Sequence, residues 1–261
     1  MQNFRPSNEE VWTFWDHLEV LRWALIRIAI VLMCIAVITF MAMPSIFEKY
    51  ILAPTTGEFF VYQWLEKFSG GMLSFTDDFV VKIINIHVAS QFFTHVSLSL
   101  SLALVLAMPY IIYEIWKFIR PALYSHEVRH VRFAFIGGTF MFYLGCLIAY
   151  LLIFPFTFHF LAEYELSTSV QNQIDLSSYI DSFVMLIMVM GLVFEMPLLA
   201  WLLSCLDLID RSILRRYKSH AVVGLMLLSA VITPSGDPLT MMLVALPLYL
   251  LYEVSIGIVR K

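Results

Sequence analysis

Six apolar stretches, separated by polar or mixed connections, dominate the pattern of residues along the chain. They cover residues 23–43, 96–115, 133–156, 179–203, 219–232 and 240–258. A bilayer core of about 30 Å requires about 20 helical residues at about 1.5 Å each, and the first four stretches reach that length. The fifth has only 14 residues, so it would extend about 21 Å and would cross only if the membrane thins locally or its polar flanks contribute. The pattern predicts an all-α, polytopic membrane protein with six transmembrane helices.

The composition agrees with lipid as the main solvent. The chain has 261 residues, of which 61% are hydrophobic and 14% are charged. A soluble domain has about 25% charged residues. We therefore expect one membrane domain over residues 1–261. The small net charge of −4 does not suggest nucleic-acid binding.

Basic residues alternate between the two sides of the predicted bundle. Of the 16 Lys and Arg residues, only Lys49, Lys67 and Lys82 lie in a connection assigned to the outside. The others lie at the two ends of the chain and in the connections at 116–132 and 204–218. The positive-inside rule then places both termini and these two connections in the cytoplasm. Because the alternation requires a crossing at 219–232, we expect the short fifth stretch to be a span.

Residues 1–22 predict an amphipathic helix at the cytoplasmic surface of the membrane. Ser7 and Glu10 have the spacing of a capping box, and apolar residues then recur at helical spacing. We expect this helix to lie in the interface before turning into the first span. Asp16 and Glu19, about one turn apart, would give it an acidic patch.

The first outer connection, about residues 44–95, is long. It contains Pro44, a possible short helix in FFVYQWLEKF (59–68) and a Gly70-Gly71 break. Connections of this length in compact proteins usually have a function or pack on themselves. We therefore expect a functional loop or a packed cap on the outer side.

One short motif raises the possibility of an enzyme. Residues 126–130 read HEVRH, which matches the H-E-x-x-H pattern of zinc proteases, with His126 and His130 as ligands and Glu127 as the base. A zinc site also needs a third ligand and an open coordination position. Asp237 lies on the opposite side of the predicted membrane, and no second signature surrounds Glu195. A chance match is favoured, and a membrane zinc protease remains an alternative hypothesis.

Glu195 lies well inside the fourth apolar stretch, in GLVFEMPLL. A carboxylate at that depth costs a few kcal/mol, so such residues face a bundle interior or a wet cavity and are functional candidates. Pro197, two residues later, removes a helix hydrogen bond and favours a kink. A structural acid, paired or protonated, is one interpretation, and a proton carrier in an ion-coupled transporter is a second alternative hypothesis.

Two further acidic residues have simpler interpretations. Glu114, near the end of the second stretch, has Lys117 three residues later, and an ion pair along the helix is expected. Asp237 lies in TPSGDP, a proline- and glycine-containing turn between the fifth and sixth stretches. For Asp237, a turn residue and a functional residue remain equally good interpretations.

Several motifs together resemble the TatC family, the polytopic subunit of the twin-arginine protein translocase. They occur in the same order and spacing over nearly the whole chain, and the P-A-L-Y-x-x-E block is the most specific. The motifs are DHLEVLR (16–22), WKFIRPALYSHE (116–127), FEMP (194–197), TPSGD (233–237) and ALPLYLLYE (245–253). Within this resemblance Glu127 is the acid of the P-A-L-Y-x-x-E block, and His130 falls outside the family pattern.

The resemblance implies a site for twin-arginine signal peptides of folded proteins on the cytoplasmic side. Guanidinium groups form forked, charge-assisted pairs with carboxylates, which suits an acidic patch. The residues implied for this site are Asp16, Glu19, Arg22, Phe118, Pro121, Tyr124 and Glu127. Glu195 would be the polar group on a concave membrane face.

The resemblance also implies a complex in the bacterial cytoplasmic (inner) membrane. Single-span TatA-type and TatB-type partners would dock near the fifth and sixth spans, at Asp237, Thr240 and Met241, and the chain would self-associate. Transport would be driven by the proton gradient, with no cofactor, no resident metal and no covalent chemistry.

Two positions depart from the family pattern. The second acid of the usual H-L-x-E-L-R motif is replaced by Val20, and Glu19 is its neighbour, about 100° away around a helix. Met241 stands where the family often has glutamine. After the first departure, either Glu19 and Asp16 supply the negative charge from a slightly different angle or recognition depends on Glu127. The second departure removes a polar contact to a partner helix.

Overall fold

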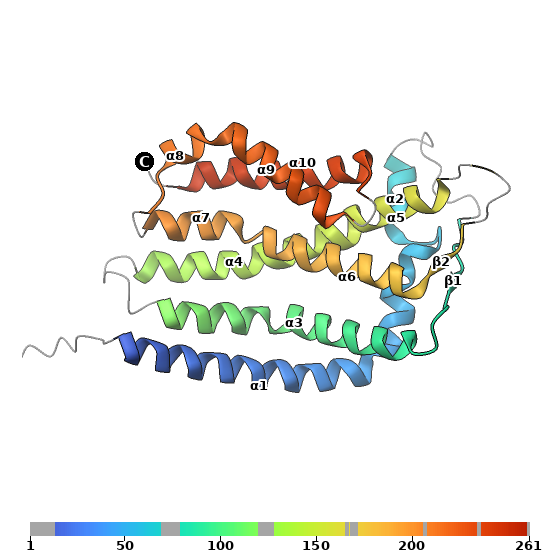
Figure 1. Ribbon diagram of the computed structural model, residues 1–261, viewed down its shortest axis with the longest axis horizontal. Coiled ribbons are helices and arrows are strands. Elements are labelled where there is room, and N and C mark those ends of the chain that lie inside the picture. Colours follow the sequence, from blue (N-terminus) through green and yellow to red (C-terminus); the bar gives the residue numbers. More distant parts are fainter. Residues whose placement is uncertain are drawn as a thin grey trace, which may run out of the picture.

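The computed structural model of the protein describes residues 14–68, 79–119, 128–164, 167, 172–205, 208–233 and 236–259. Long helices run side by side along one axis and form a bundle (Figure 1). These are α1 (Phe14–Ile46), α3 (Ser90–Ile119), α4 (Val128–Ile148), α6 (Leu176–Val193), α7 (Met196–Cys205), α9 (Lys218–Ile232) and α10 (Pro238–Ile258). Short α8 (Arg211–Arg216) precedes α9.

Five helical segments of the described chain are long and apolar enough to cross a membrane. They are Leu18–Thr55, Ser90–Phe118, Phe135–Glu163, Leu176–Cys205 and Pro238–Ile258. Each contains one of the predicted apolar stretches in whole or in large part. The remaining stretch lies in α9, a shorter apolar helix of 15 residues, which extends about 22 Å. The prediction of an all-α, polytopic membrane fold is therefore confirmed.

The first helix differs from the prediction. Residues 14–22, the described part of the predicted interfacial helix, continue without a break into the first apolar stretch, and α1 is a single helix of 33 residues. The expected turn near residue 22 was therefore wrong. The segment contains no glycine, and its one proline, Pro44, lies in the last turn, so no helix breaker is available near residue 22. Ser7 and Glu10, the predicted capping box, lie outside the described residues.

The fourth apolar stretch is interrupted where the sequence analysis expected a kink. α6 ends at Val193, α7 begins at Met196, and Phe194 and Glu195 form the turn between them. Pro197 has no N–H group to continue the helical hydrogen-bond ladder. The Glu195 N–H instead donates to the carbonyl oxygen of Leu192 at 3.1 Å. The kink predicted from Pro197 is confirmed.

Glycines bring α4 close to this break. A Cβ atom at Gly145 would lie 2.7 Å from the carbonyl oxygen of Met190 and 2.7 Å from a ring carbon of Phe194. A Cβ atom at Gly138 would lie 2.8 Å from Oε2 of Glu195. These separations are shorter than carbon atoms tolerate in a packed interior, so α4 can approach α6 and α7 this closely only without side chains at these two positions.

The first outer connection packs as a cap over one end of the bundle (Figure 1). The cap consists of η1 (Phe47–Ile51), η2 (Ala53–Thr55), α2 (Phe60–Phe68) and, from later in the chain, α5 (Phe154–Glu163), which follows the π-helical turn η4 (Ala149–Ile153). The expected short helix in residues 59–68 is confirmed as α2. We refer to this end of the bundle as the capped end.

Tyrosine hydroxyl groups hold the elements of the cap together, and to α6, by hydrogen bonds to backbone carbonyl oxygens. The hydroxyl of Tyr62 donates to the carbonyl oxygens of Pro54 and Pro155, each at 3.1 Å, and the hydroxyl of Tyr179 donates to the carbonyl oxygen of Ile51 at 2.5 Å. Burial raises the pKa of Tyr62 well above its ordinary value. The Tyr62 hydroxyl therefore remains a protonated donor.

A two-stranded parallel ribbon, which the all-α prediction did not include, joins the cap to α6. β1 (Ile83–Ile84) pairs with β2 (Ile174–Asp175). Asp175 caps α6 by accepting the N–H of Ser177 at 3.1 Å, and it also accepts the N–H of Ile86 at 3.3 Å. Desolvation alone would raise the pKa of Asp175, but these backbone hydrogen bonds outweigh it and the pKa is lowered. The carboxylate therefore stays ionised as a cap.

Close packing of α4 predicts a selective effect of adding one methyl group. Gly145→Ala should destabilise the purified protein by about 1–3 kcal/mol, because the new Cβ meets a backbone carbonyl that cannot move aside. The measurement is the thermal unfolding midpoint in detergent.

Gly137→Ala is the matched control on the same helix, since a Cβ there meets nothing within 4 Å. It should leave the midpoint unchanged or raise it slightly, because alanine favours helix over glycine. Equal midpoints for Gly145→Ala and Gly137→Ala would contradict the proposed close approach.

Candidate functional site

Several helix ends meet at the end of the bundle opposite the cap. Figure 1 shows the start of α1, the end of α3, the start of α4 and the end of α10 at this end. We refer to it as the terminal end, since α1, the first described helix, begins there and α10, the last, ends there. Several of the residues predicted for the signal-peptide site belong to these helix ends or to the chain between them.

Glu19 is an exposed carboxylate on α1 at the terminal end. Its side chain is 65% exposed, and its Oε1 lies 3.8 Å from the Nη2 of Arg22, which is 64% exposed. A surface pair at that distance contributes at most about 1 kcal/mol. The Glu19 carboxylate is therefore accessible to a second cation.

The other residues predicted for the signal-peptide site are described to different degrees. Asp16 lies in the first turn of α1, and Phe118 lies half-buried near the end of α3. Pro121, Tyr124 and Glu127 lie outside the described residues. Their chain neighbours Ile119 and Val128 end α3 and begin α4 at the terminal end.

A forked ion pair joins α1 to α3, and the sequence analysis missed it. Arg27 Nε lies 3.0 Å from Oε1 of Glu114, and Arg27 Nη2 lies 2.7 Å from Oε2. The hydroxyl of Tyr110 donates to the same Oε1 at 3.0 Å. The prediction that Glu114 pairs with Lys117 was wrong. The Glu114 carboxylate is directed across to α1 and is only 3% exposed.

A simple signal could have identified this pair. Arg27 and Glu114 both lie inside or beside apolar stretches, where charged side chains pair with one another. A basic residue in one span and an acid in the next span are natural partners. Arginine is the suitable cation because its planar fork matches both carboxylate oxygens.

Glu195 has no such partner in the described part of the chain. Its side chain is 7% exposed, and neither carboxylate oxygen has a hydrogen-bond partner among the described residues. Its carboxyl group lies against Gly138 of α4, where an added Cβ atom would be 2.8 Å from Oε2. The structure thus places one unsatisfied carboxyl group inside the membrane-spanning part of the bundle, at the break between α6 and α7.

The residues predicted for partner docking lie at the start of α10. Asp237 caps this helix: its carboxylate accepts the backbone N–H of Thr240 at 2.8 Å and also bonds the Thr240 hydroxyl. Thr240 is fully buried, and Met241 is half-buried. Asp237 therefore has a structural role in the turn, and the neighbouring exposed residues are apolar.

No metal-binding cluster is present in the part of the chain that the structure describes. Among these residues, no three His, Cys, Asp or Glu side chains lie close enough together to hold a metal. His126 and Glu127 of the HEVRH motif lie outside the described residues, and only the backbone of His130 is described, in α4.

The fold and these residues define a polytopic helical membrane protein with an acidic group on its terminal end and a buried carboxyl group between helices. Residues 16–247 match the family model described as Sec-independent protein translocase protein (TatC). The chain is 34% identical over 251 residues to the TatC protein of Blattabacterium sp. subsp. Periplaneta americana, covering 94% of both chains. It is 36% identical over 169 residues to Escherichia coli TatC, covering 65% of each.

Solved structures of TatC proteins also resemble this fold. A crystal structure titled as the twin arginine translocase receptor TatC in DDM superposes with a TM-score of 0.77 at 28% identity, covering 94% of this chain and 100% of that chain. A second crystal structure of the twin arginine translocase receptor TatC gives a TM-score of 0.73 at 29% identity.

The chain belongs to the TatC family. It is thus a membrane component of the twin-arginine protein translocase and not an enzyme. The zinc-protease and ion-coupled-transporter hypotheses receive no support from these comparisons.

The ion pair between α1 and α3 predicts unequal effects of single and double substitutions. Arg27→Leu should lower the thermal midpoint in detergent, because it leaves the Glu114 carboxylate buried without its cation. Arg27→Leu combined with Glu114→Leu should recover most of that loss.

Arg22→Leu, at an exposed arginine on the same helix, is the control and should have little effect. If the double variant were as unstable as the sum of Arg27→Leu and Glu114→Leu, the two side chains would not act as a pair.

Proposed function

We propose that this chain binds the paired arginines of twin-arginine signal peptides at its terminal end. The observation that carries the proposal is the accessible carboxylate of Glu19 on α1, beside the helix ends that flank Glu127 in the chain. Asp16, Glu19 and Glu127 together would supply the negative charge. Arg22, Phe118, Pro121 and Tyr124 would shape the site around the peptide.

Carboxylates suit this ligand for a physical reason. Arginine presents a planar fork that makes two parallel hydrogen bonds to one carboxylate, whereas lysine is a compact point charge. The protein itself contains such a fork in the Arg27–Glu114 pair. Glu19, displaced around the helix from the family's usual acid at Val20, would approach the ligand from a different angle.

Glu195 and the start of α10 would serve the other contacts of the complex. We infer that single-span TatA-type and TatB-type partners dock along α9 and α10, near Asp237, Thr240 and Met241. The exposed residues there are large and apolar, including Leu239 at 49% and Met242 at 67%. Glu195 would offer a hydrogen-bonding group to a segment inserted into the bundle. The proton gradient would supply the energy for transport. The chain would also self-associate.

We further propose six spans in the bacterial inner membrane, with both termini in the cytoplasm. α1 starts and α10 ends at the same end of the bundle (Figure 1), as an even number of crossings requires. The basic residues outside the first outer connection favour the terminal end as the cytoplasmic one. α9, at about 22 Å, would thin the membrane locally.

Reversing the charge at Glu127 tests the signal-peptide site. Glu127→Lys, at unchanged expression, should abolish crosslinking to a twin-arginine signal peptide, because a cation would then repel the paired guanidinium groups. Glu58→Lys, at an exposed acid of the cap, is the charge-matched control and should leave crosslinking intact. Undiminished crosslinking of Glu127→Lys would remove this residue from the site.

Cysteine labelling tests whether α9 crosses the membrane. In a background without Cys34, Cys146 and Cys205, Leu239→Cys should react with an impermeant maleimide from outside intact spheroplasts. Asp210→Cys, before α9, should react only after permeabilisation. Labelling of both positions from the same side would refute the fifth crossing.

A further inference from the structure

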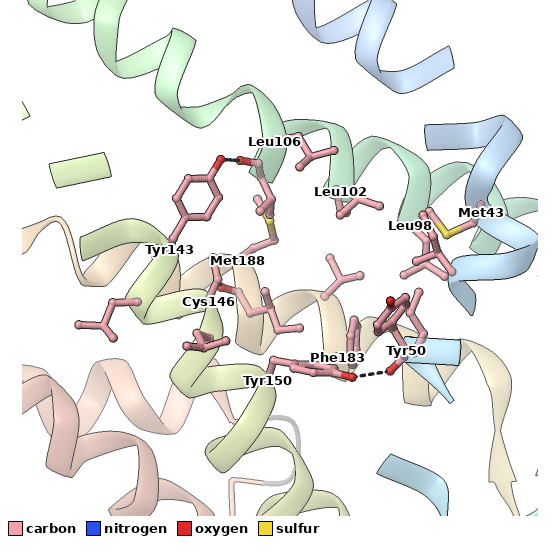
Figure 2. Close-up of a pocket in the computed structure, with 18 of the residues that line it drawn as sticks. Met43, Tyr50, Leu98, Leu102, Leu106, Tyr143, Cys146, Tyr150, Phe183 and Met188 are labelled. Atoms are coloured by element: carbon pink, nitrogen blue, oxygen red, sulfur yellow. Dashed lines mark hydrogen bonds between the residues drawn. The ribbon is translucent and has the colours of Figure 1, made fainter. Parts of the chain in front are cut away.

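A large apolar cavity lies between α1, α3, α4 and α6, toward the capped end of the bundle. Its volume is about 720 Å³. Figure 2 shows side chains from these helices and from the π-helical turns η1 and η4 converging on it. Neither the proposed signal-peptide site at the terminal end nor Glu195 belongs to its lining.

The cavity lining offers almost nothing to a polar ligand. No Asp, Glu, Lys, Arg or His contributes to it. Three tyrosines are present: the Tyr143 hydroxyl donates to the carbonyl oxygen of Val105 at 3.2 Å, and the Tyr150 hydroxyl donates to that of Tyr50 at 2.9 Å (Figure 2). The third, Tyr50, lies at the end of the first span and is 50% exposed. Water needs two to four polar partners in such a cavity, so water is not a stable occupant.

The second of these bonds lies at the capped end of the cavity. Tyr150 lies in η4 and Tyr50 lies in η1. Their hydrogen bond holds the end of the first span against the middle of the third helical segment. Along its side, the cavity is bordered by exposed residues of membrane-spanning helices, including Leu106 at 50% and Phe140 at 63%. It therefore opens toward lipid.

The volume distinguishes between two apolar occupants. A helix with side chains is about 10–12 Å wide and rises about 5.4 Å per turn, so one turn occupies roughly 400–600 Å³. The cavity would hold fewer than two turns, which is too little for a membrane-spanning peptide helix. A flexible hydrocarbon chain fits an irregular cavity of this size.

A cation lies where such a chain would reach the membrane surface. Lys49 is exposed, and its Nζ lies 5.4 Å from the centre of the Tyr50 ring, which lines the cavity. A lysine at a span end can extend to the headgroup layer and pair with a phosphate. We propose that the cavity holds one acyl chain of a glycerophospholipid whose phosphate group pairs with Lys49.

Native mass spectrometry of the full chain, extracted gently from its own membrane, tests this proposal. The wild-type protein should retain one glycerophospholipid per chain. Leu102→Trp fills the cavity and should lose that adduct, and Leu144→Trp, on a different helix of the lining, should do the same. Met41→Trp, at a position 80% exposed on α1, should retain it.

A headgroup variant and a stability measurement complete the design. Lys49→Gln should release the phospholipid at lower detergent concentration than wild type, whereas Lys67→Gln, at another exposed lysine of the cap, should not. Delipidation should lower the thermal midpoint of wild type more than that of Leu102→Trp, since the indole replaces the lost chain. This second readout separates cavity filling from misfolding.

Four results would overturn the proposal. They are a wild-type protein that retains no phospholipid, equal retention in Leu102→Trp and Met41→Trp, an adduct without phosphate, and signal-peptide crosslinking from a photoreactive residue at position 144. None of them concerns Glu19 or Glu127, so failure here leaves the proposed signal-peptide site intact.

Discussion

The constraint on which the structure depends is the lack of water along the membrane-spanning helices. Each polar group there needs a partner from the protein itself, because an unpaired group costs several kcal/mol in hydrocarbon. The Arg27–Glu114 fork, with Tyr110 as a third member, meets this constraint between α1 and α3. Thr39 provides a second example, because its hydroxyl group donates a hydrogen bond across to the carbonyl oxygen of Ser99 in α3.

The Glu195 carboxyl group does not meet this constraint among the described residues, and its surroundings explain how it is held. Pro197 interrupts the helix, Gly138 admits the carboxyl group against α4, and neither of its oxygens is paired. A buried carboxyl group without a partner is unfavourable in the isolated chain. It becomes favourable when another molecule supplies a hydrogen bond, which is the behaviour expected of a subunit that receives other segments within the bilayer.

The two ends of the bundle differ in chemistry for the same reason. At the capped end, tyrosine hydroxyl groups and the Asp175 cap satisfy carbonyl and N–H groups where helices stop or turn. At the terminal end, Glu19 and Arg22 remain exposed and only loosely paired. The capped end is thus held by hydrogen bonds between its elements, whereas the described charges of α1 at the terminal end are free to meet another cation or anion.

Much of this fold could be predicted from the sequence, because hydrophobic length and the distribution of basic residues report directly on a membrane. The kink at Pro197 and the short helix α2 were also predictable from local residue chemistry. The continuous α1 was not, since an amphipathic pattern reports which face is apolar and not whether the helix bends. The partner of Glu114 was missed because helical spacing favours neighbours such as Lys117, whereas Arg27 becomes adjacent only when α1 packs on α3. The close approach of α4 at Gly138 and Gly145 likewise depends on tertiary packing.

The central claim, that carboxylates at the terminal end select a paired guanidinium ligand, is tested most directly by comparing two peptides. Purified protein in nanodiscs is titrated with a signal peptide carrying Arg-Arg and with the same peptide carrying Lys-Lys. Hydrogen bonds to charged groups contribute about 1.5–3 kcal/mol, so wild type should prefer Arg-Arg by roughly 10- to 150-fold. The Asp16→Asn, Glu19→Gln, Glu127→Gln variant should lose this preference, and a preference equal to that of wild type would contradict the account.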